Sequence, residues 1–234
     1  MIENLPQYVG PVFILTTFLT AGFLIYAVRT SAADSLSGKV VLFILAFWLM
    51  FQAILGTGGF FQNTEAMPPR IFAFGALPAL AFIVLIFVFA RTRFVDRLPL
   101  KVLTLLHIVR IPVELVLLWL FQGGIIPESM TFEGRNFDIL SGITAPIVYL
   151  LAFRGGTVNR PLLIIWNVLA LLLLVNVVAT AVLSFPGPIQ QLSFDQPNRA
   201  IMYFPYNWLP SVIVPVVLFA HLAAFRQLLS KSTN

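Results

Sequence analysis

Cysteine is absent from this chain, and charged residues are scarce. The 234 residues contain no Cys and two His, and only 10% are Asp, Glu, Lys or Arg, whereas 59% are hydrophobic. The lack of cysteine excludes disulfides, thiolate catalysis and thiolate metal sites. Soluble globular proteins carry about 25% charged residues. This composition, with a mean hydropathy of +0.96, therefore excludes a soluble domain and indicates a polytopic membrane protein whose surroundings are the lipid bilayer.

Lysine is equally scarce, since the chain has only Lys39, Lys101 and Lys231. None of them lies in the last long apolar run, which excludes a retinal Schiff base there. No nucleophile is paired with a general base in a recognisable pattern. The sequence therefore favours a non-enzymatic role and leaves an intramembrane enzyme open. The net charge of +5 does not indicate a nucleic-acid partner, because the basic residues follow a pattern of membrane topology.

Long apolar runs dominate the chain. Runs of about 17–25 residues mark transmembrane helices. They predict an all-α integral membrane protein that is a seven-transmembrane-helix bundle, with residues 1–234 forming a single transmembrane domain. The predicted spans are 9–28, 40–56, 70–90, 101–121, 138–153, 161–183 and 206–225.

The basic residues predict the orientation of this bundle. Cytoplasmic loops of membrane proteins carry an excess of Lys and Arg. One set of joints and ends holds ten basic residues: Arg29, Lys39, Arg91, Arg93, Arg97, Lys101, Arg154, Arg160, Arg226 and Lys231. The other set holds Arg70, Arg135 and Arg199. We therefore predict an N-terminus outside, a cytoplasmic C-terminus and a multi-pass location in the cell membrane, which would be the inner membrane in a Gram-negative bacterium.

The fourth predicted span carries a polar stripe within HIVRIPVELVLLWL, residues 107–120. His107, Arg110 and Glu114 are spaced so that they point within roughly 60° of one another on a helix. Pro112 removes one backbone hydrogen bond and predicts a kink beside them. Polar groups in a membrane helix face the bundle interior.

Arg110 lies near the middle of the bilayer, where a charge costs at least about 2.5–3.5 kcal/mol. An ion pair with Glu114, four residues further along the helix, is the nearest interaction that would offset this cost. Such a pair is either purely structural or part of a binding site for a ligand, ion or proton. The second reading places Glu114 in a change of protonation or occupancy, and Arg110 against an anionic group.

The two histidines suggest a different chemistry. His107 and His221 fall at similar depth in the inner half of the fourth and seventh spans. Two such histidines could hold one haem or share one metal ion. Hydrogen bonding of each histidine to a neighbouring helix is the alternative.

Further candidates lie on other segments. Gln52 is level with Glu114. Asp138 opens the fifth span, either as a helix N-cap or as a ligand contact or arginine partner. The outer joints pair an acid with a lone arginine, which predicts either local salt bridges or a lid over a cavity. Arg135, Asp195 and Arg199 are the candidates for this lid.

Three functions remain open from sequence. The first is a bundle that binds a small ligand, ion or proton as a transporter or sensor. The second is a haem or metal protein that uses His107 and His221. The third is a non-catalytic subunit of a larger membrane complex, because almost no part of the chain is soluble.

Overall fold

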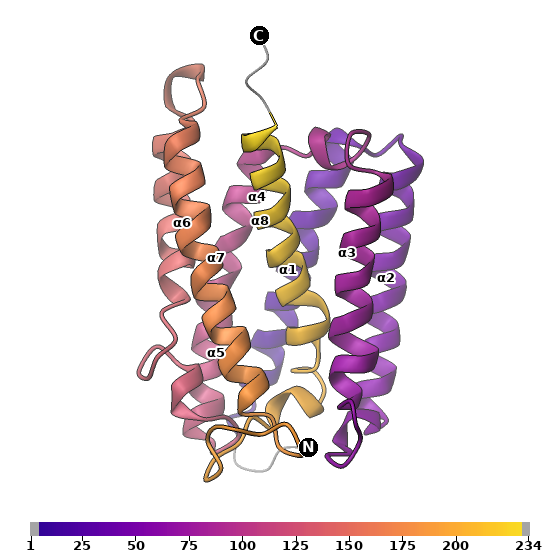
Figure 1. The fold of residues 1–234 in the computed structure, drawn as a ribbon, viewed down its shortest axis with the longest axis vertical. Helices are drawn as coiled ribbons and strands as arrows, with labels where there is room; N and C mark the ends of the chain where they lie inside the picture. The colour runs from indigo at the N-terminus through magenta and orange to yellow at the C-terminus, as the bar shows by residue number, and fades with distance from the viewer. Residues whose placement is uncertain (1–4, 231–234) are drawn as a thin grey trace.

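The computed structural model describes residues 5–230, and they form a bundle of helices with no strand in that range (Figure 1). The α-helices are α1 Val9–Ser31, α2 Leu36–Thr57, α3 Leu77–Phe89, α4 Leu100–Leu106, α5 Arg110–Gln122, α6 Ile139–Ala152, α7 Arg160–Leu183 and α8 Val214–Leu229. Short 3-10 turns lie at Phe60–Gln62, Val95–Arg97, His107–Val109, Glu128–Met130, Arg154–Gly156 and Ala200–Met202. Two π-helical turns, η2 Phe72–Ala76 and η8 Leu209–Ile213, precede α3 and α8.

Six helices are long and apolar enough to cross a membrane, which is consistent with a membrane location. They are Val9–Ser31, Leu36–Thr57, Phe72–Phe89, Leu100–Gln122, Arg160–Leu183 and Leu209–Leu229. The fifth predicted span, 138–153, corresponds to α6, which has 14 residues. At 1.5 Å per residue it is about 21 Å long, against about 30 Å of hydrocarbon. The length criterion therefore identifies six of the seven predicted spans.

The ends of these helices follow local sequence signals. Ser35 begins α2 and its Oγ accepts a hydrogen bond from the Gly38 amide at 3.0 Å, as an N-cap does. Asn159 does the same for α7, accepting from the Leu162 amide at 3.2 Å. In the fourth span the 3-10 turn His107–Val109 separates α4 from α5. This break lies one turn before Pro112, where the missing amide was expected to disturb the helix.

The bundle has a packed centre and a looser edge. α8 packs against α4 and α7, and α1 packs against α4 and α5. α2 and α3 lie at one edge, on the right of Figure 1. In the segment Phe72–Phe89, which contains η2 and α3, 17% of the residues are buried, compared with 61% within Leu209–Leu229. The inner helices therefore position the polar groups, while α3 has few protein neighbours.

The chain runs from one end of the bundle to the other. α1 begins at the lower end in Figure 1 and α8 ends at the upper end. The α1–α2, α3–α4 and α6–α7 joints lie at the upper end in Figure 1, and they contain most of the arginines that were predicted to be cytoplasmic. The joints at the lower end contain Arg70, Arg135 and Arg199. Lys231, also counted as inner, lies outside the described residues.

Candidate functional site

A cluster of buried polar side chains lies where α5, α6, α7 and α8 meet. His107, Arg110, Glu114 and His221 are each at most 2% exposed, and Asp138 is 4% exposed. All five were singled out from the sequence. Such burial is costly for charged groups unless they are paired and hydrogen-bonded.

Arg110 is held mainly by Asp138, and the expected ion pair with Glu114 is wrong. The Arg110 Nη2 atom lies 2.6 Å from Asp138 Oδ1, and Nε donates to Oδ2 at 2.7 Å. Nη2 also donates to the Ala170 carbonyl of α7 at 3.0 Å. Asp138 begins α6 without capping it through its side chain. Its carboxylate instead contacts the guanidinium through both oxygens, and Oδ2 accepts the hydrogen bond between the two groups.

Gly142 makes this ion pair reachable. It lies one helical turn after Asp138, so the two residues share a face of α6. A Cβ atom at Gly142 would come within 2.9 Å of the Ile111 amide nitrogen and 3.4 Å of the Arg110 Cβ. The backbones of α5 and α6 therefore approach closely only because this residue has no side chain. That approach brings Asp138 to Arg110.

Glu114 has one partnered carboxylate oxygen and one free. Its Oε1 accepts a hydrogen bond from Asn136 Nδ2 at 2.7 Å, whereas the buried Oε2 has no hydrogen-bond partner. Asn136 also donates to the Met130 carbonyl at 2.9 Å, and its Oδ1 accepts from the Asp138 amide at 3.0 Å.

Asn136 is the site residue that sequence reasoning missed. It is fully buried and ties Glu114 to the start of α6. The one available signal was its place two residues before Asp138, because Asn often bonds to the backbone two residues on in such turns.

The two histidines, which were candidates for haem or metal ligation, have adjacent rings. Their ring centroids are 4.0 Å apart and the rings are tilted by 33°, so no porphyrin fits between them. His221 Nδ1 is 2.9 Å from Asn167 Oδ1, and its Nε2 is 3.5 Å from Arg110 Nη1. His107 Nδ1 is buried without a hydrogen-bond partner. Within residues 5–230, no group of three or more His, Asp or Glu could hold a metal ion.

The remaining candidates differ from this cluster in their partners or in their exposure. Gln52 is fully buried but donates to the Phe74 carbonyl at 2.7 Å, between α2 and η2. Arg135, Asp195 and Arg199 are exposed. Among the described residues, the ion pairs are Arg110–Asp138 and Arg226–Asp96, so the local salt bridges expected in the outer joints are not formed.

A cavity of about 510 Å³ borders the polar cluster. Arg110, Glu114 and Asp138 are its charged lining residues, and the rest of the wall is apolar except for backbone atoms. The apolar wall comes from η2, α3, α5, α7, η8, α8 and the outer joints. Ligand pockets are typically about 300–1,000 Å³ and mostly apolar with a few polar groups. This cavity has those properties.

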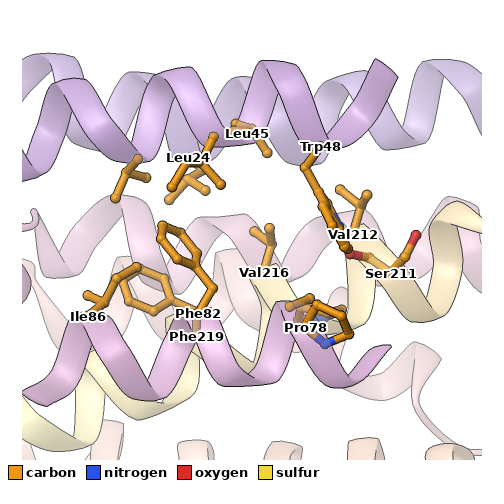
Figure 2. A pocket seen from close by; sticks show the side chains of 14 residues that line it. Leu24, Leu45, Trp48, Pro78, Phe82, Ile86, Ser211, Val212, Val216 and Phe219 are labelled. Carbon is orange, nitrogen blue, oxygen red and sulfur yellow. The ribbon is translucent and has the colours of Figure 1, made fainter. Parts of the chain in front are cut away.

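A second, smaller cavity lies on the other side of α3. It has a volume of about 190 Å³ and lies among α1, α2, α3 and α8. Figure 2 shows Trp48 and Leu45 on one side of it, facing Pro78, Phe82 and Phe219 on the other. It has no charged lining residue, and its polar lining side chains, Trp48 and Ser211, both donate hydrogen bonds within the protein. α3 is thus bordered by a cavity on each side.

Comparison with known protein families matches residues 68–229 to the family described as Domain of unknown function (DUF8737). The chain belongs to this family. The matched region begins before η2 and ends with α8, so it contains the whole polar cluster. Neither the curated proteins nor the solved structures contain a match to this chain.

Proposed function

We propose that this member of the DUF8737 family is a multi-pass protein of the cell membrane that binds a small ligand within the bilayer, as the binding step of a transporter or sensor. The observation that carries this proposal is that Glu114 lines the cavity of about 510 Å³ and that its buried Oε2 atom has no hydrogen-bond partner. A buried carboxylate oxygen without a donor is costly. A ligand with a donor group would remove that cost.

The proposal includes seven crossings with an external N-terminus. α6 is short, but α5 and α7 run in the same direction. The chain must therefore return across the bundle between them, and α6 is the helix that does so. The helices alternate between the two ends of the bundle in Figure 1. Basic residues gather at one of these ends, which is the cytoplasmic end by the positive-inside rule.

The arrangement supports binding at Glu114 rather than at Arg110. The guanidinium already contacts Asp138, Ala170 and His221. The Glu114 carboxylate has only Asn136. The anionic ligand expected at Arg110 from sequence is therefore less well supported than a ligand that donates to Glu114.

The test is to identify small molecules that remain bound to the purified chain. Val178 lines the cavity, so Val178→Phe should fill part of it and lower the co-purified amount about tenfold. Val168, on the same helix, is 43% exposed and lines neither cavity, so Val168→Phe is the matched control. The measurement is mass spectrometry of the extract from protein purified in mild detergent. Equal retention by the two variants, or no retained molecule in the unsubstituted chain, would contradict the proposal.

A further inference from the structure

We infer that the ligand is a lipophilic amine, with an apolar body in the cavity and one cationic donor at Glu114. This inference rests on the proposed function and names its ligand class. It follows from the charges around the cavity, the nature of its wall and the place where it reaches the surface.

The charges around the cavity favour a cation. Arg110 and Asp138 form a neutral pair at 2.6 Å. Glu114 is a further acidic group, and its Oε2 faces no protein donor. The contacts of His221 fit a neutral imidazole. Its Nε2 accepts from the Arg110 guanidinium, and its Nδ1 donates to the side-chain oxygen of Asn167. An ammonium group would both donate to Oε2 and balance the carboxylate, and charge-assisted hydrogen bonds are stronger than neutral ones.

The wall of the cavity requires an apolar body. Outside the charged cluster, the wall consists of Val, Leu, Ile, Ala, Phe, Met and Pro residues. Such a wall has no side-chain groups that would pair with several polar substituents, and unpaired polar groups are costly to bury. A small inorganic cation is also disfavoured, because it would need several oxygen ligands. One donor on an apolar body matches this distribution.

The cavity reaches the protein surface on the side that faces lipid. Its lining residues Leu77 on α3 and Val175 on α7 are each 55% exposed. Its lining residues Met130 and Ile201, from the outer joints, are only 1% and 3% exposed. A ligand therefore reaches Glu114 between α3 and α7, through hydrocarbon. Amphipathic amines partition into bilayers and meet this requirement.

The test uses three probes that share one apolar body and differ in the head group: 4-phenylbutylamine, 4-phenylbutan-1-ol and 4-phenylbutanoate. Calorimetric titration of the full chain in detergent micelles, with protein-free micelles subtracted, gives the three dissociation constants. We expect the amine to bind at least about tenfold more tightly than the alcohol, because a hydrogen bond to a charged group is the stronger one. The carboxylate should bind most weakly.

Glu114→Gln is the deciding variant, since its carbonyl oxygen can still accept from Asn136. It should remove the preference for the amine and leave the affinity for the alcohol within about twofold. Equal or tighter binding of the alcohol or the carboxylate, or no binding of the amine, would overturn the amine assignment. A preference for the amine that survives Glu114→Gln would do the same. The proposed function has its separate test in the co-purified ligand and the Val178→Phe comparison.

Discussion

At the scale of single residues, Arg110 shows how a charge can be buried in an apolar bundle. The guanidinium is 2% exposed and is surrounded by the Asp138 carboxylate, a backbone carbonyl and a histidine nitrogen. Three different elements supply these acceptors. Removal of one charge from a buried pair leaves the other without compensation, which is more costly than the absence of both.

Asp138→Asn should therefore destabilise the protein strongly, by about 3–5 kcal/mol. Asp96→Asn is the matched control, because the Arg226–Asp96 pair spans 3.2 Å and its side chains are 32% and 28% exposed. That second change should cost less than about 1 kcal/mol. The measurement is the midpoint of thermal unfolding, followed by size-exclusion chromatography of heated samples. Similar losses in the two variants would show that Asp138 is not the main counter-charge of Arg110.

At the scale of elements, two side chains of α2 donate hydrogen bonds to carbonyl groups that lie four residues before a proline. Pro78 lacks the amide that would bind the Phe74 carbonyl in an α-helix, and Gln52 donates to that carbonyl instead. Pro215 has the same relation to Ser211, whose carbonyl accepts from Trp48 Nε1 at 2.8 Å. α2 is thus attached to both π-helical turns through carbonyl groups that proline leaves free.

A double-mutant cycle tests the role of Gln52. Gln52→Leu should destabilise the protein by about 1–3 kcal/mol, because the Phe74 carbonyl loses the donor that the buried Gln52 side chain supplies. In a Pro78→Ala background, the new amide at position 78 can serve that carbonyl, so the same change should cost clearly less. Thermal unfolding of the four proteins gives the coupling. An equal cost in both backgrounds would show that the hydrogen bond to the Phe74 carbonyl is not what Gln52 contributes to stability.

At the scale of the whole molecule, the proposed seven crossings depend on α6. Its 14 residues are too few for a full span without help from its ends. Glu133 lies before α6 and Thr157 after it, and both are exposed. The chain contains no cysteine, so a single introduced thiol can be labelled without a background reaction.

We expect a membrane-impermeant maleimide to label Glu133→Cys in intact cells. Thr157→Cys should be labelled only after the membrane is permeabilised, because α6 separates the two positions. The measurement is the mass shift of each variant on a gel. Labelling of both positions from outside would remove α6 as a crossing, and the reverse pattern would invert the proposed orientation.

The apolar helices and the polar stripe could be predicted from local signals. The hydrogen-bond and ion-pair partners of the stripe residues could not. The apolar runs identify six long helices, since each helix satisfies its own backbone in hydrocarbon. The spacing of His107, Arg110 and Glu114 on one helix was sufficient to place them together inside the bundle. The partner of Arg110 was predicted wrongly because residues four apart are the only neighbours visible without tertiary structure.

The sequence by itself determined the helical membrane-type architecture, the disturbance of the helix near Pro112 and the buried polar stripe of His107, Arg110 and Glu114. Tertiary structure alone decided that Arg110 pairs with Asp138, 28 residues away, that Asn136 holds Glu114, and that the two histidine rings touch. The physical reason is that these contacts depend on how closely and in what register α6 packs on α5. A glycine at position 142 permits that approach, and only the assembled bundle shows which side chain it brings to the arginine.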